Sequence, residues 1–158
     1  RWFRTGNIIE DAIISDLESI GIEVTDRQRE VVIVNGNITL KGHIDGIASG
    51  QLLEIKSASE KYFKQLLKVG YEKWNPKYKA QAHVYMVLCD LEECMVVVEN
   101  KNDSNIYIET LKLDRDYVTK LLIDVFAAIT LPEPPERICP DVSWYESKCC
   151  KYQEVCFT

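Results

Sequence analysis

Residues 42–56 of the chain read GHIDGIASGQLLEIK. Side chains alternate along a strand, so Glu54 and Lys56 are predicted to project from one face while the residue between them points into the core. The Ser-Gly pair in the middle of the stretch is typical of a turn, which would place Asp45 on the preceding strand beside Glu54. The stretch therefore predicts two neighbouring strands that gather two carboxylates and one lysine.

These three side chains suit one kind of chemistry. Two carboxylates that converge on one point are costly unless a cation lies between them, and oxygen ligands suit Mg²⁺ or Mn²⁺. Lys56 beside such a cation can orient an attacking water or stabilise negative charge that develops on a phosphate. The set fits metal-assisted hydrolysis of a phosphodiester. The pattern alone fits equally a half-exposed strand whose charges serve only solubility.

Helices and strands are predicted in a mixed order along the chain. A first helix runs from Asn7, as N-cap, to Gly21, where helical spacing of apolar residues stops. Asn35-Gly36 predicts a hairpin between two strands. We expect strands at 31–34, 38–47, 51–57, 95–99 and 106–113, and helices at 61–69, 76–88 and 117–129, the last capped by Asp114. This order predicts a single-domain α/β fold with a central mixed β-sheet flanked by helices.

Two further motifs accompany the acidic strands. Arg4-Thr5-Gly6-Asn7-Ile8-Ile9-Glu10 lies on the predicted first helix, and Gln81-Ala82-His83-Val84-Tyr85 lies on a later one. Together with Gly42-His43-Ile44-Asp45 and Glu54-Ile55-Lys56, they resemble the PD-(D/E)XK nuclease superfamily, in its RecB-like and phage (lambda-type, YqaJ-like) exonuclease branch. The resemblance implies a restriction-endonuclease-like core and a divalent-metal-dependent deoxyribonuclease.

The resemblance also implies roles for single residues. Asp45, Glu54 and the Ile55 carbonyl would bind Mg²⁺ or Mn²⁺, and Glu10 would add a ligand or orient a water molecule on the metal. Gln81 and Tyr85, one turn apart on one helix face, would contact the substrate or brace the active site. The predicted catalytic residues are Asp45, Glu54, Lys56, Glu10, Gln81 and Tyr85. A solvated carboxylate is the alternative for Glu10, and an ordinary amphipathic face is the alternative for the Gln-Tyr pair.

Both histidines lie beside these motifs. His43 shares a strand face with Asp45 and could support a ligand. His83 lies on another helix face from Gln81, and we expect it to be structural. A Glu at position 10, where RecB-like members commonly have His, favours the phage side of the resemblance.

A basic tract lies within an acidic chain. The net charge is −6, yet residues 56–79 hold seven lysines against Glu60 and Glu72, a local charge of +5, so the rest of the chain carries −11. Such a tract attracts phosphate locally, because steering depends on the distribution of charge. A solvated helix face is the alternative. The predicted DNA contacts are Lys61, Lys64, Lys68, Lys73, Lys77 and Lys79.

Cysteines gather at the end of the chain. We predict a nuclease core over residues 1–131 and a Pro- and Cys-rich tail over 132–158 that packs on the same domain. The clustering favours reduced thiols, some of them metal ligands, over a disulfide framework. The tail resembles the iron–sulfur subset of these nucleases, with Ser147 in place of the first cysteine. This resemblance implies an iron–sulfur cluster or Zn²⁺, and a metal-free remnant is equally compatible; the candidate ligands are Cys139, Cys149, Cys150 and Cys156.

The cellular location of the protein is predicted from the absence of a long apolar run and of a leader. No apolar run reaches the roughly 18 residues of a membrane span, and no leader precedes the first helix, so we expect a cytoplasmic protein of a bacterium or phage-infected cell, neither secreted nor in a membrane. The resemblance implies a DNA exonuclease of phage-type recombination or repair, whose partners are DNA and a single-strand annealing or helicase-type protein. The alternatives are a structure-specific or restriction-type endonuclease on the same fold, and an inert DNA-binding module with a Cys-bound structural metal.

Overall fold

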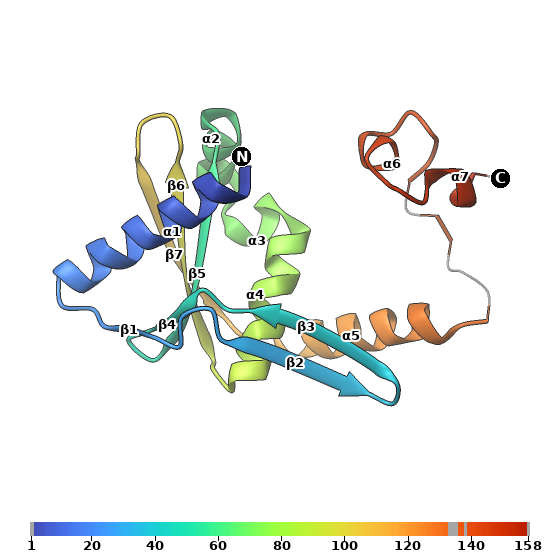
Figure 1. Ribbon diagram of the computed structural model, residues 1–158, viewed down its shortest axis with the longest axis horizontal. Helices are drawn as coiled ribbons and strands as arrows, with labels where there is room; N and C mark the ends of the chain where they lie inside the picture. Colours follow the sequence, from blue (N-terminus) through green and yellow to red (C-terminus); the bar gives the residue numbers. More distant parts are fainter. Residues whose placement is uncertain (1, 133–135, 138, 158) are drawn as a thin grey trace. The chain divides into compact units, whose positions relative to one another are not determined.

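The computed structural model describes residues 2–132, 136–137 and 139–157 (Figure 1). Of residues 2–5, the last two of which begin the first-helix motif, only the backbone is described. The chain divides into two compact units, residues 1–122 and 123–158. The predicted division at 131/132, with the tail packed on the core, stays a prediction.

A five-stranded sheet forms the centre of the first unit. Its order is β1 (Val24–Thr25), β4 (Gly46–Ala48), β5 (Gln51–Ala58), β6 (Glu93–Asn100) and β7 (Ile106–Lys112). β5 and β6 are parallel, and the other neighbours are antiparallel. The sheet is therefore mixed, which confirms the predicted fold class.

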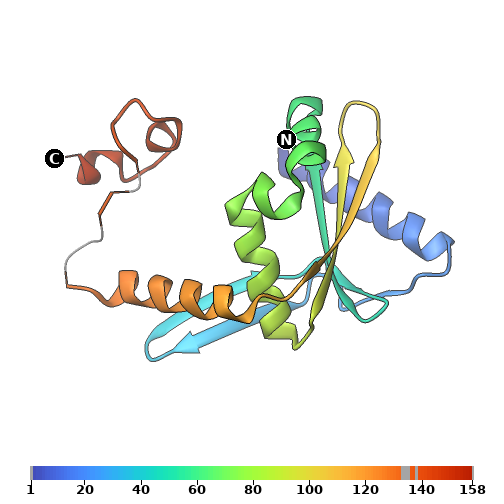
Figure 2. The same cartoon turned by 180° about the vertical axis from the view of Figure 1, so that it is seen from behind.

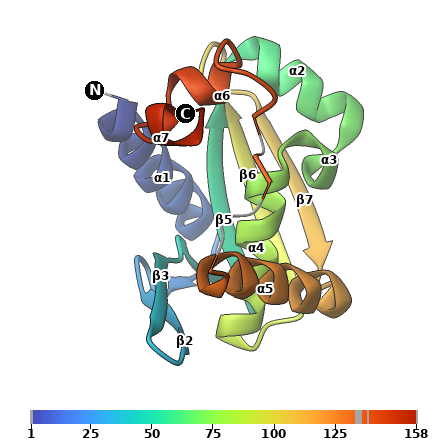
Figure 3. The same cartoon turned by 90° about the vertical axis from the view of Figure 1, so that its right-hand side faces the viewer.

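Helices cover both faces of this sheet. α1 (Trp2–Ser19) packs against β5, while α2 (Glu60–Val69) and α4 (Pro76–Cys89) pack against β5 and β6, with α3 (Tyr71–Trp74) between them in the chain. Figures 2 and 3 show α1 and α4 on opposite sides of β5. β5 and β6 are parallel, so the chain between them must cross over from one end of the sheet to the other. The helices α2–α4 form this crossover.

Two apolar clusters follow from this layering, one on each face of the sheet. Alternate residues of β5 and β6 enter opposite clusters, as the period of a strand requires. The cluster under α1 contains Ile13, Ile14, Leu17, Val24, Ala48, Leu53, Ile55 and Val97. The cluster under α2–α4 contains Val31, Ile44, Leu52, Ala58, Phe63, Leu66, Tyr71, Ala82, Met86, Cys94, Val96, Val98 and Leu111.

The predicted hairpin forms a separate two-stranded sheet. β2 (Glu30–Asn35) pairs with β3 (Ile38–His43), and Asn35 lies opposite Ile38. The turn residues are therefore 36 and 37, and Gly36 supplies a positive φ of 57°. The hairpin is confirmed, with its turn one residue later than the Asn35-Gly36 signal indicates.

The strand predicted at 38–47 is wrong in its continuity. It breaks at Ile44 and Asp45, where the chain leaves the hairpin and enters the five-stranded sheet as β4. The Ile44 N–H donates to the carbonyl of Arg29 at 3.1 Å, beyond the end of the β2–β3 pairing. Gly46 then passes so close to β1 that an added Cβ would lie 2.8 Å from Val24.

Helix ends are predicted unevenly. Asn7 lies inside α1, so its prediction as an N-cap is wrong, whereas Gly21, with φ 86°, follows the helix end as expected. Asn75 caps α4, accepting the Lys77 N–H at 2.9 Å. Asp114 caps α5 (Arg115–Thr130) through the Tyr117 N–H at 2.9 Å, which confirms that prediction. Neither β1 nor α3 was predicted.

The second unit holds the end of α5 and two short helices, α6 (Tyr145–Lys148) and α7 (Gln153–Cys156). Gln153 joins them by donating to the Ser147 hydroxyl at 3.2 Å. Within the described residues of both units, none of the helices combines the length and apolar character needed to cross a membrane.

Candidate active site

β5 positions Glu54 and Lys56 on the side of the sheet that faces α2–α4. Ile55, between them, joins the apolar cluster under α1, which confirms the predicted alternation. Glu54 is fully buried, and the Lys56 side chain is 18% exposed. The Lys56 ammonium forms an ion pair with Glu54 Oε1 and donates to the Ile55 carbonyl at 3.3 Å.

Asp45 lies in the break between β3 and β4, not on a strand. The pairing of β4 with β5 ends where Gly46 lies opposite Leu53. Beyond that point the Asp45 carboxylate replaces a partner strand, since its Oδ2 accepts the Ile55 N–H at 2.7 Å. This bond fixes the carboxylate beside β5 and next to Glu54.

The two carboxylates share more negative charge than Lys56 neutralises. Burial raises the pKa of Glu54 to about 7, and the charges of Asp45 and Glu10 add to the rise against the opposing effect of Lys56. Burial also raises the pKa of Asp45. Burial alone would lower the pKa of Lys56, but the Glu54 and Asp45 charges outweigh it and raise that pKa. The site therefore favours an additional cation.

A fit to a metal ion rests on one atom in particular. Glu54 Oε2 is buried and, in the part of the chain that the structure describes, has no hydrogen-bond partner. Such a buried carboxylate oxygen is costly without a ligand to bind. Among the described residues no group of three or more His, Cys, Asp or Glu side chains could hold a metal ion, so no third side chain of these types joins Asp45 and Glu54 in this structure.

Glu10 reaches the same region from α1. Its Oε1 accepts the Gln28 side-chain N–H at 2.5 Å. Burial raises the pKa of Glu10, and the Asp45 charge contributes to the rise against the Gln28 hydrogen bond. Glu10 thus lies within electrostatic reach of Asp45, but its role as a ligand stays a prediction. No sequence pattern pointed to Gln28, whose φ of 54° belongs to a tight turn before β2.

Gln81 and Tyr85 meet on α4, where the Gln81 side chain lies close enough to the Tyr85 hydroxyl to oppose the rise of its pKa. Burial raises the pKa of Tyr85, and the Glu54 charge contributes, so the phenol lies within reach of the acidic pair. The ring also covers Gly42 on β3, where an added Cβ would lie 2.1 Å from the hydroxyl oxygen. The glycine that precedes Asp45 in the motif is therefore explained by the close approach of this tyrosine.

The predicted lysines occupy three helices. α2 carries Lys61, Lys64 and Lys68, α3 carries Lys73, and α4 carries Lys77 and Lys79. Glu60 pairs with Lys64 at 2.6 Å, and Glu72 lies 3.5 Å from Lys79, so part of the positive charge is offset. All except Lys79 are exposed.

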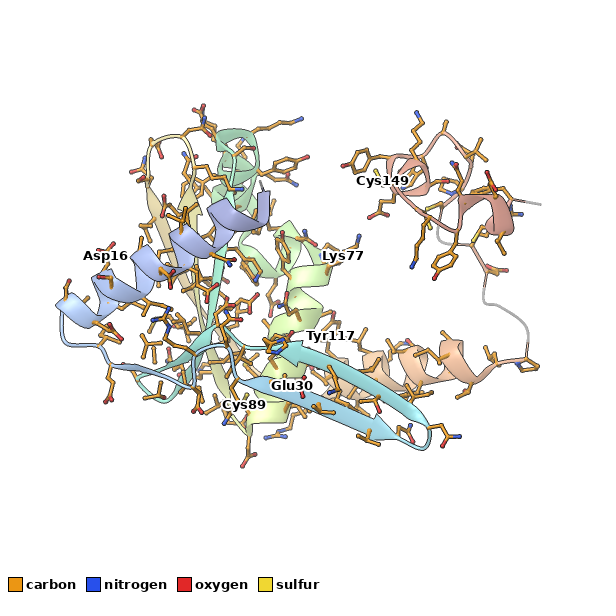
Figure 4. The ribbon with its side chains drawn as sticks, in the orientation of Figure 1. Asp16, Glu30, Lys77, Cys89, Tyr117 and Cys149 are labelled. Carbon is orange, nitrogen blue, oxygen red and sulfur yellow. The ribbon has the colours of Figure 1, made fainter. Side chains whose placement is uncertain are left out.

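The histidines have different surroundings. His43 is exposed on β3. His83 is buried, accepts the Asp114 N–H through Nδ1 at 3.2 Å, and places Nε2 3.4 Å from Glu72. Its ring also contacts the edge of Tyr117, labelled in Figure 4. These contacts fit the structural role that we expect for His83.

The tail cysteines are free thiols, with Cys139 half-buried and Cys149, Cys150 and Cys156 exposed. Desolvation raises the pKa of Cys139. The nearby charge of Glu146 and the thiols of Cys150 and Cys156 raise it further. Cys139 thus lies within electrostatic reach of Cys150 and Cys156, but as described these thiols do not form a group that could hold a metal ion. The presence of a metal on them stays a prediction.

Comparisons with known proteins identify the fold. No protein-family model and no curated protein matches the chain. Solved structures do match, and they show that the chain has the fold of alkaline and phage-related exonucleases. The predicted resemblance is confirmed at the level of the fold.

The matching structures are distant in sequence. The alkaline exonuclease LHK-Exo from Laribacter hongkongensis aligns with 21% identity and a TM-score of 0.62, over 79% of this chain and 65% of its own. Its complex with dAMP aligns with 21% identity and a TM-score of 0.61, over 78% and 64%. A phage-related exonuclease from Haemophilus somnus 129PT aligns with 17% identity and a TM-score of 0.55, over 79% of this chain and 67% of its own. The chain thus spans slightly less than two thirds of LHK-Exo.

Replacing Gly42 by Ala should destabilise the protein by about 1–3 kcal/mol, because the new methyl group overlaps the Tyr85 ring. The measurement is a double-mutant cycle by denaturant unfolding. In a Tyr85→Ala background the same glycine substitution should cost little. An equal cost in both backgrounds would contradict the contact.

The metal-free protein should lose stability as the pH rises from about 4.5 to about 7. Over this range the folded state keeps a proton on Glu54, whose ordinary pKa is 4.5 and whose folded pKa is about 7, so folding binds a proton that the unfolded chain releases. The difference corresponds to about 3 kcal/mol. Unfolding in EDTA across this range measures it for the wild type, for Glu54→Gln and for the exposed control Glu18→Gln.

Only the Glu54→Gln variant should show a shallower fall. If its stability falls with pH as steeply as that of the wild type, Glu54 is not the group that binds the proton.

Proposed function

We propose that this protein is a divalent-metal-dependent deoxyribonuclease that hydrolyses phosphodiester bonds. The observation that carries the proposal is the fully buried Glu54 carboxylate, whose Oε2 lacks a hydrogen-bond partner within the described residues while Asp45 lies beside it. A buried acidic pair of this kind is typical of a site that binds a hard cation.

The donor set fits Mg²⁺ or Mn²⁺. Asp45 and Glu54 would hold the ion together with the Ile55 carbonyl, which already faces the Lys56 ammonium. Glu10 would add a ligand or orient water. When bound, the ion supplies a Lewis acid and neutralises negative charge.

Lys56 has the position to act on the substrate. Its side chain remains partly exposed, while Glu54 and Asp45 hold the ammonium in the charged form. It would stabilise charge on the phosphate or orient the attacking water. Tyr85 would act indirectly, because its ring covers Gly42 at the end of β3 and so supports the break that carries Asp45.

The finer parts of the proposal have different support. DNA as substrate and exonucleolytic action agree with the names of the matched structures and with LHK-Exo having been solved with dAMP. Phage-type recombination or repair, a partner protein of annealing or helicase type, and a cytoplasmic location rest on sequence alone. End-labelled linear DNA and covalently closed circular DNA separate the possibilities, since an exonuclease degrades only the first, an endonuclease cuts both, and an inert binding module cuts neither.

The tail cysteines are proposed to hold an iron–sulfur cluster or Zn²⁺. The support for this proposal is that the thiols of Cys150 and Cys156 lie near enough to Cys139 to affect its pKa. Elemental analysis of anaerobically purified protein tests it. Absence of both iron and zinc would leave the thiols as packing residues or remnants.

Asp45→Asn and Glu54→Gln should each lower DNA cleavage by orders of magnitude, because each removes a ligand charge from the metal site. Asparagine can still accept the Ile55 N–H, so the fold of the first variant should persist.

Lys56→Met should lose cleavage but keep Mn²⁺ binding, since an ammonium does not ligate a cation. Cleavage assays with parallel calorimetry measure both properties, and Lys112→Met on β7 is the control. Full activity in Asp45→Asn or Glu54→Gln would refute the site.

Neutralising the lysines of α2 should flatten the salt dependence of DNA binding. Each lost phosphate contact lowers the log–log slope by about 0.9 for duplex DNA. Lys61 and Lys68 should contribute more than Lys64, which is paired with Glu60. Binding titrations of single and triple Lys→Gln variants, with Lys112→Gln as control, measure the slope. An unchanged slope in the triple variant would mean that this face is only solvated.

A further inference from the structure

Three aromatic rings meet where α3 joins α4. Tyr71 and Tyr78 are stacked, with centroids 6.4 Å apart and an angle of 19°. Trp74 lies 5.4 Å from Tyr78 and 6.0 Å from Tyr71, tilted against both. Such offset and tilted arrangements are the favourable geometries for aromatic contacts.

The core fixes the innermost ring of this cluster. Tyr71 is fully buried, and its backbone N–H donates to Glu109 of β7 at 2.9 Å. The Asn75 cap starts α4 directly after Trp74, which sets that ring beside Tyr78. Trp74 and Tyr78 remain partly exposed. The cluster is therefore held from inside and presents two rings at the surface.

The surface rings adjoin the candidate active site. The Lys56 ammonium lies 5.5 Å from the centroid of the Tyr78 ring, within the range of a cation–π contact. The same ammonium thus contacts both the Tyr78 ring and the Glu54 carboxylate. Tyr78 is therefore the ring that joins this cluster to the predicted catalytic lysine.

Two exposed lysines lie close in the chain to the two partly exposed rings. Lys73 and Lys77 are exposed and flank Trp74 in the chain, one on α3 and one in the first turn of α4. In Figure 4 the Lys77 side chain projects away from its helix. Aromatic faces bordered by cations are the combination that binds single-stranded nucleic acid, the rings stacking on bases and the cations contacting phosphates.

We propose that Trp74 and Tyr78 form a stacking surface for an unpaired nucleobase of the substrate, with Lys73 and Lys77 contacting the adjoining phosphates. This inference rests on the proposed nuclease function and deepens it. Bases within a duplex are already stacked on each other, so only a frayed or single-stranded segment can use the rings. The substrate entering beside Lys56 is therefore single-stranded at that point.

The first experiment changes the DNA and leaves the protein intact. In EDTA, where no cleavage occurs, the wild-type chain is titrated with a fluorescently labelled single strand and with the same strand carrying consecutive abasic sites. Removing the bases should weaken binding about tenfold or more, since stacking contributes about 1–3 kcal/mol per base. Equal affinity for both strands would overturn the proposal.

The second experiment locates the effect. Trp74→Leu and Tyr78→Leu should each lower affinity for the intact strand several-fold and reduce the further loss that abasic sites cause. Binding of blunt duplex should change little. Tyr78→Phe keeps the ring and should bind like the wild type. Tyr62→Leu, at an exposed aromatic residue of α2, is the control. Equal losses for single strand and duplex, or none, would contradict the assignment.

The two proposals fail separately. Binding in EDTA does not depend on the metal site, whereas cleavage with Mg²⁺ or Mn²⁺ does. Base-dependent binding without any cleavage would uphold the stacking surface and reject the nuclease. Cleavage with base-independent binding would do the reverse.

Discussion

The hydrogen bond from the Ile55 N–H to the Asp45 carboxylate is the contact on which the site depends. Asp45 lies where the chain leaves the β2–β3 hairpin and enters the five-stranded sheet. Its side chain therefore marks the boundary between the two sheets. Because the carboxylate replaces a strand partner, Asp45 cannot turn to solvent without leaving a buried amide unpaired. The resulting geometry holds two acids together although burial and mutual repulsion oppose it.

The surrounding packing maintains this unfavourable charge. Tyr85 covers Gly42 and thereby supports the strand that leads to Asp45. Lys56 neutralises one charge and is held by Glu54, by the Ile55 carbonyl and by the Tyr78 ring. The remaining charge is the physical reason to expect a cation. Buried carboxylates whose charge is not fully neutralised are typical of a functional site and not of a core optimised for stability.

Local signals predicted the parts whose determinants lie close together in sequence. The alternation of Glu54 and Lys56, the hairpin, and the Asp114 cap each depend on a few neighbouring residues. The break at Asp45 was missed because it depends on the Arg29 carbonyl, and the ring cluster was missed because Glu109 holds Tyr71 from β7. Gln28 was missed for the same reason, since its partner Glu10 lies on α1. Long-range hydrogen bonds of this kind leave no periodic trace in a sequence.

The measurement that tests the central claim most directly is incubation of the purified wild-type chain with end-labelled linear DNA, with and without Mg²⁺ or Mn²⁺. The account predicts hydrolysis only when one of these ions is present, with release of labelled product that EDTA stops. Absence of cleavage with either ion, or cleavage that persists in EDTA, would contradict a metal-dependent nuclease built on Asp45 and Glu54.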